Sequence, residues 1–275
     1  MTKSQWQCFL ENLGIWQGSF IRISPHGEVI RDIPSIVSFT ELEDKRTIRQ
    51  VVQREGEQDL VLEYSSLPRS TLFFDNGAFS QGSLQFAPFS EFGAELGLIY
   101  GNRRLRLVQF FNPQQELSHY TLIPEYLAGT SLEPNPPLKI EDLLGEWQGE
   151  AITIYTDWRS PDNYSTQLNL TLDNLGRLQQ SLSYGDRTIT TSASICGSIL
   201  QFDQNPQNPI QVILLPHGAS ATSPVKISLR QPFFLEVGWL IEINLRQRMI
   251  RTYNEKGEWV SLTLVTEKKV SSSNG

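Results

Sequence analysis

Two glutamates occupy matching places in apolar segments, an uncommon setting for a side chain that ionises at neutral pH. Glu95 opens the segment Glu95-Leu96-Gly97-Leu98-Ile99, and Glu236 opens Glu236-Val237-Gly238-Trp239-Leu240. Because burying an unpaired carboxylate is costly, each glutamate must face solvent, meet a charged partner inside the protein, or contact a ligand. We favour a structural ion pair at both places and keep Glu236 as a candidate ligand contact.

Aromatic rings with arginines nearby in the sequence form a second set that could bind a ligand. An apolar cavity lined by such rings would take a flat molecule, and an arginine near its mouth would receive a carboxylate. Packing of the protein's own core is the alternative, because a barrel must fill its interior. With Glu236, the candidate ligand-binding residues are Tyr155, Trp158, Arg159, Tyr164, Tyr184 and Arg187.

No group of residues has the pattern of a catalytic or metal site. His26, His119 and His217 lack the spacing of metal ligands, and Cys8 and Cys196 lie outside any Cys-x-x-Cys motif. The chain contains no Gly-x-Ser-x-Gly, no phosphate-binding glycine loop and no His-Glu-x-x-His. We therefore predict no catalytic residues and no metal, and an enzyme is the less favoured alternative.

The elements that position the candidate residues come from an internal repeat. Leu13-Gly14-Ile15-Trp16-Gln17-Gly18 recurs as Leu144-Gly145-Glu146-Trp147-Gln148-Gly149, an offset of 131 residues (144 minus 13). The chain is thus two copies of one domain. The offset grows to 141 at Glu95 and Glu236 (236 minus 95), so the second copy carries about ten more residues, which we expect in loops. At offset 142, Arg106, Asn112, Glu116, Thr121, Leu122 and Glu125 match Arg248, Asn254, Glu258, Thr263, Leu264 and Glu267.

Hydrophobic periodicity predicts a short helix followed by many strands in each copy. Trp6, Phe9, Leu10 and Leu13 have helical spacing, so residues 3–13 should form a helix that ends at Gly14. A shorter stripe precedes Gly145. Apolar and polar residues then alternate between turns, which predicts about eight to ten antiparallel strands per copy and favours an all-β fold of two tandem closed barrels.

Composition shifts divide the chain into predicted domains. Residues 133–138 are rich in proline, which fixes φ and restricts the residue before it, so they should form a stiff linker. The small polar tail is expected to be disordered. The domains are a first barrel at 1–132, the linker at 133–138, a second barrel at 139–270 and the tail at 271–275.

Charge and hydropathy exclude some classes of partner. The 275 residues carry a formal net charge of −7, which argues against nucleic acid as a partner, because binding phosphates requires clustered Lys and Arg. No apolar run is long enough to cross a bilayer, and no signal-peptide core follows Met1. We predict a cytoplasmic protein that does not insert into membranes.

A short helix, then Gly-x-Trp at the start of the first strand, then a meander of strands resembles the lipocalin or calycin superfamily. Gly14-x-Trp16 and Gly145-x-Trp147 carry this resemblance. It implies that each Trp packs across the closed end of a barrel with an Arg from a late strand against it. Arg106 and Arg248 are the candidates for that role, with Arg104 or Arg251 as alternatives.

The closing segments of both copies are similar to those of cyanobacterial proteins of unknown function built from tandem lipocalin-like domains, a resemblance that covers residues 3–269. S-type and T-type phycobiliprotein lyases belong to the same superfamily and are similar at the level of the fold. The resemblance implies binding of a hydrophobic small molecule, with a bilin or another tetrapyrrole as a candidate. Two alternatives are a lyase or chaperone that delivers a bilin to a phycobiliprotein, and a scaffold without ligand that acts through protein contacts.

Overall fold

The computed structural model describes residues 3–130, 135–202 and 209–270, and the chain forms two compact units. Unit 1 consists of Met1–Leu84, Gly93–Phe110 and Ser118–Pro134, whereas unit 2 consists of Gln85–Phe92, Phe111–Leu117 and Asn135–Gly275. Two short segments of the first repeat therefore belong to unit 2. The expected tail at 271–275 and the first two residues of the expected linker, Glu133 and Pro134, lie outside the described residues.

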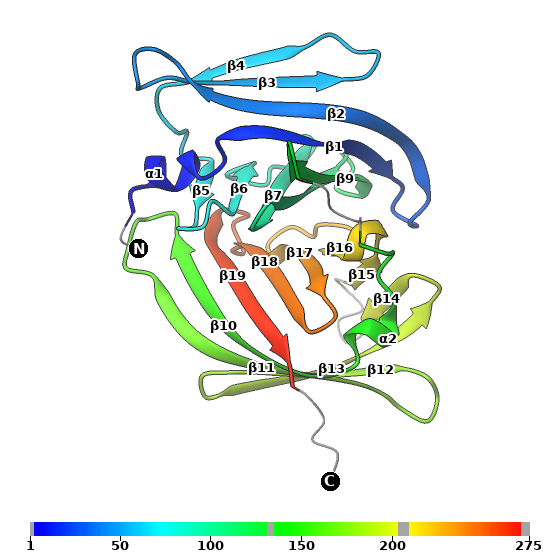
Figure 1. The fold of residues 1–275 in the computed structure, drawn as a ribbon. Coiled ribbons are helices and arrows are strands. Elements are labelled where there is room, and N and C mark those ends of the chain that lie inside the picture. Colours follow the sequence, from blue (N-terminus) through cyan, green and yellow to red (C-terminus); the bar gives the residue numbers. More distant parts are fainter. Residues whose placement is uncertain (1–2, 131–134, 203–208, 271–275) are drawn as a thin grey trace. The chain divides into compact units, whose positions relative to one another are not determined.

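Unit 1 is built on a curled sheet of nine strands that stays open (Figure 1). The order of neighbouring strands is β4-β3-β2-β1-β9-β8-β7-β6-β5, so β4 and β5 are its edges. Its elements are α1 Gln5–Leu10, β1 Gly14–Ile23, β2 Val29–Glu41, β3 Ile48–Arg54, β4 Leu60–Tyr64, β5 Thr71–Phe73, β6 Phe79–Gly82, β7 Phe92–Tyr100, β8 Arg103–Phe111 and β9 Leu117–Leu127.

Unit 2 contains a closed barrel in which each strand pairs with the next and β19 returns to β10 (Figure 1). The prediction of an all-β fold with a short helix before each barrel-like domain is confirmed. The expectation that both barrels close holds for unit 2 and is wrong for unit 1, where β4 and β5 do not pair. The elements are α2 Ile140–Leu143, β10 Gly145–Tyr155, β11 Asp162–Leu172, β12 Leu178–Tyr184, β13 Arg187–Cys196, β14 Ile199–Phe202, β15 Ile210–Leu214, η1 Pro216–Gly218, β16 Ala219–Pro224, β17 Phe233–Glu242, β18 Leu245–Tyr253 and β19 Trp259–Lys269.

Strand β14 is the addition that distinguishes the second repeat from the first. In unit 1, Leu60 on β4 is the last of a row of residues that lie opposite one another on neighbouring strands. Ile189 on β13 ends the equivalent row in unit 2, and the two residues are 129 positions apart (189 minus 60). On the other side, Phe73 on β5 lies opposite Phe79, which lies opposite Gly97. Leu214 on β15 is related to the repeated glycine Gly238 in the same way, through Ser220. Phe73 and Leu214 are therefore counterparts, 141 positions apart (214 minus 73). The added residues thus lie between these strands, and part of them pairs as β14 instead of forming a loop.

Helix α1 packs at the open side of unit 1. Phe9 contacts Phe39, Tyr64 and Phe73, with ring centroids 5.5 to 5.9 Å apart. The side-chain amide of Gln5 makes the two hydrogen bonds that a neighbouring strand would make to the edge of β5. It donates to the carbonyl oxygen of Phe73 (2.9 Å) and accepts from the N–H of the same residue (2.7 Å). One helix of six residues therefore covers part of the gap that a strand fills in unit 2.

The start of α1 is set by its sequence. Ser4 accepts a hydrogen bond from the backbone N–H of Gln7 (3.2 Å), and the side chain of Gln7 accepts one from the N–H of Ser4 (2.8 Å). This reciprocal cap satisfies backbone donors that the first helical turn leaves unpaired. It also orients the helix so that Cys8 and Phe9 are buried against the sheet.

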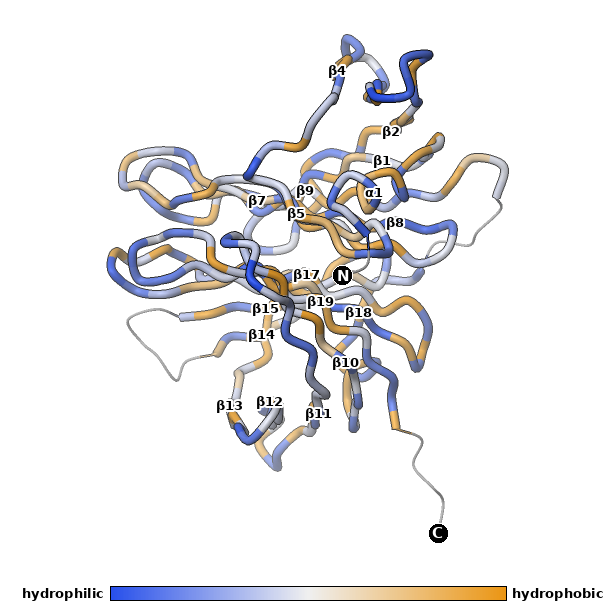
Figure 2. Tube along the Cα trace, turned by 90° about the vertical axis from the view of Figure 1, so that its left-hand side faces the viewer, coloured by the Kyte–Doolittle hydropathy of each residue, from blue (hydrophilic) through white to orange (hydrophobic). Residues whose placement is uncertain are grey.

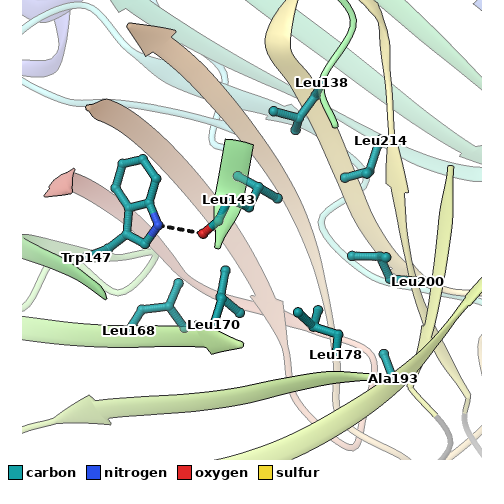
Figure 3. Packing of buried hydrophobic residues seen from close by; sticks show 9 residues of the cluster. All are labelled: Leu138, Leu143, Trp147, Leu168, Leu170, Leu178, Ala193, Leu200 and Leu214. Carbon is teal, nitrogen blue, oxygen red and sulfur yellow. Dashed lines mark hydrogen bonds between the residues drawn. The ribbon is translucent and has the colours of Figure 1, made fainter. Parts of the chain in front are cut away.

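Leucines packed beside Trp147 form the core of the barrel in unit 2 (Figure 3). Along β11 the side chains alternate, with Thr166, Leu168 and Leu170 buried and their neighbours exposed, as expected for a strand with one face inside. Fully burying a leucine stabilises a fold by about 1.5–3 kcal/mol. The cluster consists of Leu138, Leu143, Trp147, Leu168, Leu170, Leu178, Ala193, Leu200 and Leu214.

Residues 135–138 of the expected linker are hydrogen-bonded to unit 2. Asn135 donates to the carbonyl oxygen of Leu240 (2.7 Å), and the N–H of Leu138 donates to that of Leu215 (3.0 Å).

Figure 2 shows hydrophilic and hydrophobic residues interleaved along the strands. Within the described ranges, no helix combines the length and apolar character required to cross a bilayer.

Candidate functional site

Both indoles of the repeated Gly-x-Trp motif are buried and make the same hydrogen bond. Nε1 of Trp16 donates to the carbonyl oxygen of Asn12 (2.9 Å), and Nε1 of Trp147 donates to that of Leu143 (2.8 Å), four residues before the Trp in each case (Figure 3). Each bond ties the end of the preceding helical segment to the first strand. The two indoles are therefore anchored to the backbone in the same way.

Arg104 and Arg246 are the arginines that lie over these indoles. The Cζ atom of Arg104 is 4.4 Å from the ring centroid of Trp16, and that of Arg246 is 5.1 Å from the ring of Trp147. In unit 1 the arginine is therefore the alternative Arg104 and not Arg106. In unit 2 it is Arg246, which replaces both Arg248 and the alternative Arg251, whose Cζ lies 3.4 Å from the ring centroid of Trp259. Side chains two residues apart on a strand share a face, so sequence patterning alone could not tell which arginine of each pair lies level with the Trp.

One buried carboxylate in unit 1 holds both arginines. Glu125 accepts from Nε of Arg104 (2.7 Å) and from Nε and Nη2 of Arg106 (2.8 and 2.9 Å). Arg106 also donates to Glu95 (2.7 Å). Burial alone would raise the pKa of Glu125, but the attraction of Arg104 and then Arg106 outweighs it and lowers the pKa to about 2. The carboxylate is thus fully ionised at neutral pH.

Unit 2 repeats this cluster, with longer contacts at Arg248 than at Arg106. Glu267 accepts from Nε of Arg248 (3.1 Å) and from Arg246, but its Oε2 has no hydrogen-bond partner among the described residues. Nη1 of Arg248 lies 3.6 Å from Oε1 of Glu236, whereas the matching pair in unit 1 is 2.7 Å apart. Burial raises the pKa of Glu236, and Arg248 opposes this effect only in part.

Glycine in the repeated motif leaves room for each buried glutamate. A Cβ atom on Gly18 would lie 2.0 Å from the carbonyl oxygen of Pro124, and one on Gly149 would lie 2.7 Å from Cβ of Glu267. Both distances are too short for real atoms. The second glycine of the motif is therefore required by the ion-pair cluster, an assignment that the sequence analysis missed although the glycines and glutamates all repeat.

Hydroxyl groups line part of the inner wall of the barrel in unit 2. Thr153 hydrogen-bonds to Thr263 (2.8 Å) and to the phenolic oxygen of Tyr164 (3.2 Å). The buried hydroxyls of Thr166 and Thr191 have no hydrogen-bond partner within the described residues. Polar atoms of this kind are the groups that a bound polar molecule or water would satisfy.

The predicted ligand-binding residues fall into three groups. Tyr164 and Tyr184 lie near one another, with ring centroids 6.1 Å apart, and exposed Arg187 pairs with Tyr184 across β12 and β13. Arg159 covers the ring of Tyr155 at 3.5 Å, and that tyrosine donates to Asp162. Trp158 belongs with this second group, because its N–H donates to the carbonyl oxygen of Tyr155 (3.2 Å), and it is 62% exposed in a left-handed backbone conformation (φ 63°). Glu236 stands alone as part of the ion-pair cluster.

The described residues contain no group of three or more His, Cys, Asp or Glu side chains that could hold a metal ion. His119 instead packs against the ring of Phe110, with centroids 5.0 Å apart, and contacts Arg22. Burial lowers the pKa of His119, and Arg22 adds to the effect, so its imidazole favours the neutral form.

Comparisons with known proteins divide the chain at the same place as the repeat. Residues 2–130 match the N-terminal domain of unknown function DUF3598, and residues 134–270 match the C-terminal domain of "Biogenesis factor required for ATP synthase 1". No curated protein matches the chain.

Two solved structures are similar to this chain to different degrees. A DUF3598 protein of unknown function from Nostoc punctiforme is 56% identical, with a TM-score of 0.95, over 98% of this chain and all of that one. The S-type phycobiliprotein lyase CPES from Guillardia theta is 12% identical, with a TM-score of 0.35, over 49% of this chain and 92% of that one.

Proposed function

The chain belongs to the DUF3598 family, and from that premise we propose that it is a biogenesis factor that acts by binding another protein. The observation that carries the proposal is the match of residues 134–270 to the C-terminal domain of a biogenesis factor required for ATP synthase. That stretch includes every strand of the closed barrel. The partner we propose is a subunit of ATP synthase, met in the cytoplasm before assembly.

The interiors of both units favour recognition through outer surfaces. The buried arginines and glutamates bind one another, and leucines fill the space beside Trp147. An interior occupied by the protein's own side chains supports the scaffold alternative of the sequence analysis. Because these charged side chains are paired with one another inside the units, a partner protein would be recognised by the exposed strands and loops.

The proposal is tested by binding and by assembly. Each ATP synthase subunit, purified alone, would be titrated with this protein, and a host strain lacking the gene would be assayed for assembled ATP synthase. We expect one subunit to bind and the level of assembled enzyme to fall. If no subunit binds and assembly is unchanged in the deletion strain, the proposal is wrong.

A second candidate function is binding of a hydrophobic small molecule, such as a bilin or another tetrapyrrole, by unit 2. It is favoured by the buried hydroxyls of Thr166 and Thr191, which have no partner within the described residues, and by the left-handed backbone of exposed Trp158. Its residues would be Tyr155, Trp158, Arg159, Tyr164, Tyr184, Arg187 and Glu236.

Titration with bilins, haem and fatty acids, followed by tryptophan fluorescence, tests this second function. Quenching that is lost in Tyr164→Phe but kept in Tyr64→Phe, a tyrosine of unit 1, would support it. No quenching by any of the compounds would remove it. Delivery of a bilin to a phycobiliprotein has its own test, which is a coloured covalent adduct on co-expression.

A further inference from the structure

We propose that the inner face of the unit 1 sheet, the face that carries Trp16, binds the carboxylate or phosphate group of a small organic anion at Ser35 and Arg54. This function is additional to the protein contacts proposed above. Ser35 is 7% exposed, and its Oγ has no hydrogen-bond partner within the described residues. The buried Nε of Arg54 also lacks a partner there. Buried donors without a partner are costly, so an acceptor supplied by a ligand would stabilise both.

The two donors lie together on one face of the sheet. Ser35 on β2 is directly opposite Arg54 on β3, and side chains of directly opposite residues share a face. The Arg54 side chain extends back across β2, because its Cζ lies 5.4 Å from the ring centroid of Phe20 on β1. The guanidinium group is thus above β2, beside Ser35. Phe20 is four residues after Trp16 on the same strand, so this is also the face of the buried indole.

Arginines outnumber their paired carboxylates at this end of the face. Arg22 and Arg31 lie opposite each other on β1 and β2, on the same face as the two donors. Among the described ion pairs, Arg31 and Arg54 share the carboxylate of Glu57, at 3.4 and 2.9 Å, while Arg22 contacts the imidazole of His119 (3.4 Å). This surplus of positive charge favours an anion over a neutral carbonyl compound as the ligand.

Phe20 gives the site an apolar surface beside its charged groups. The ring is half-buried, and Ile33, which is 9% exposed, lies directly opposite it on β2. The guanidinium of Arg106 lies 5.5 Å from the same ring but is held by Glu125 and Glu95. An anion that accepts hydrogen bonds from Arg54 and Ser35 would therefore rest its apolar part on Phe20, which points to an organic acid or an organic phosphate.

The matching place in unit 2 has the hydroxyl without the arginine. Thr166 is the counterpart of Ser35 at offset 131 (166 minus 35), because each lies opposite the second glycine of the repeated motif. The hydroxyl of Thr166 also lacks a partner within the described residues. Tyr184 is opposite Thr166, where unit 1 has Arg54 opposite Ser35. The pair of donors is thus a property of unit 1, and unit 2 supplies a matched control.

The proposal is tested by titrating the full-length protein with benzoate, phenyl phosphate and neutral benzamide. Nuclear magnetic resonance of nitrogen-15-labelled arginine side chains follows the Nε–H groups, and Arg54→Lys identifies the signal of Arg54. We expect that signal to shift with at least one anion, and the anion that binds tells carboxylate from phosphate. Benzamide should bind about tenfold more weakly, because it lacks the charge.

Two variants test the donors, and two test the fold and the place. Arg54→Lys keeps the charge but removes Nε–H, and it should weaken binding about tenfold, as should Ser35→Ala. Arg49→Lys, at an exposed ion pair on β3, and Thr166→Ala in unit 2 should leave the dissociation constant unchanged. Without ligand, Ser35→Ala should unfold at or above the wild-type temperature, because it removes a buried hydroxyl that has no partner.

Three results would overturn the proposal. The first is that neither anion shifts the Arg54 signal, and the second is that benzamide binds as tightly as the anions. The third is wild-type affinity in both Ser35→Ala and Arg54→Lys, which would place the anion elsewhere. None of these results bears on the proposed function, because the titrations contain no ATP synthase subunit.

Discussion

Glu125 fills the space that a side chain on Gly18 would need, since a Cβ atom there would lie 2.9 Å from its Cγ. Gly149 and Glu267 are related in a similar way in unit 2, where a Cβ atom on Gly149 would lie 2.7 Å from Cβ of Glu267. The repeated glycine and the repeated glutamate therefore form one structural feature, and a side chain on the glycine would require the strand that carries the glutamate to move.

Replacing either glycine should destabilise its unit. Forcing atoms into a packed site costs about 1–3 kcal/mol, and Gly18→Ala should cost more than Gly149→Ala because its nearest contact is backbone at 2.0 Å. Urea unfolding followed by tryptophan fluorescence measures the loss. Gln148→Ala, a change at an exposed neighbour, should stay within about 0.5 kcal/mol of wild type. Wild-type stability of Gly18→Ala would contradict the steric argument.

Removing the shared carboxylate should be more damaging. Glu125→Gln removes the carboxylate that pairs with buried Arg104 and leaves Arg106 with Glu95 alone, and breaking a buried pair costs about 3–5 kcal/mol. The control is Glu63→Gln, which breaks an ion pair with Arg49 whose side chains are 49% and 48% exposed and should cost at most about 1 kcal/mol. Equal losses in the two variants would show that burial does not decide the cost.

Acid should weaken the fold through the same carboxylate. Because the pKa of Glu125 is lowered from 4.5 to about 2, its contribution is complete above pH 4.5 and is lost as the pH falls through about 2. The urea midpoint of the wild-type protein should therefore fall across this interval. In Glu125→Gln the fall should be smaller, and an unchanged pH profile in that variant would contradict the assignment.

Glu236 should have the opposite pH dependence. Its pKa is raised above 4.5, so the stability that it contributes is complete below that pH and is lost as the pH rises through its folded pKa. Compared with Glu236→Gln, the wild-type protein should lose stability above pH 4.5.

Glu95→Gln is the matched variant in unit 1, and it should destabilise the protein more at neutral pH than Glu236→Gln does. The reason is that Glu95 is 2.7 Å from Arg106, whereas Glu236 is 3.6 Å from Arg248.

The Gln5 side chain should protect the edge of β5. In Gln5→Ala the N–H of Phe73 loses its acceptor, so hydrogen exchange at that amide should become faster. The control is Gln53→Ala, which removes an exposed hydrogen bond from β3 to Asp59. It should leave the exchange rate of the Phe73 amide unchanged. Unchanged exchange in Gln5→Ala would mean that the helix itself, and not the amide, covers the edge.

Periodicity and the internal repeat predicted the elements because both are properties of neighbouring residues. The stripe of Trp6, Phe9 and Leu10 identified α1, and the repeated Trp16 and Trp147 identified the start of each first strand. The closure of each sheet was not predictable in the same way. It depends on whether β14 pairs with β13 and β15, which is a long-range choice that local patterning does not contain.

The site was predictable only in part for a similar reason. An ion pair at Glu95 and Glu236 follows from the cost of burying a charge, and both glutamates do meet arginines. Arg104 and Arg246 were harder to choose, because residues two apart on a strand face the same way. Glu125 and Glu267 were visible as repeated positions, but only the register of β9 and β19 places them beside the arginines.

The presence of β14 in one half alone has a consequence for how the two halves diverged. A difference of 12 residues (141 minus 129) between two neighbouring strands separates the open sheet of unit 1 from the closed ring of unit 2. The charged cluster inside each half could not drift as easily, since its tryptophan, glycine, two arginines and two glutamates constrain one another. The two halves therefore differ at the edge of the sheet and agree in the cluster at its centre.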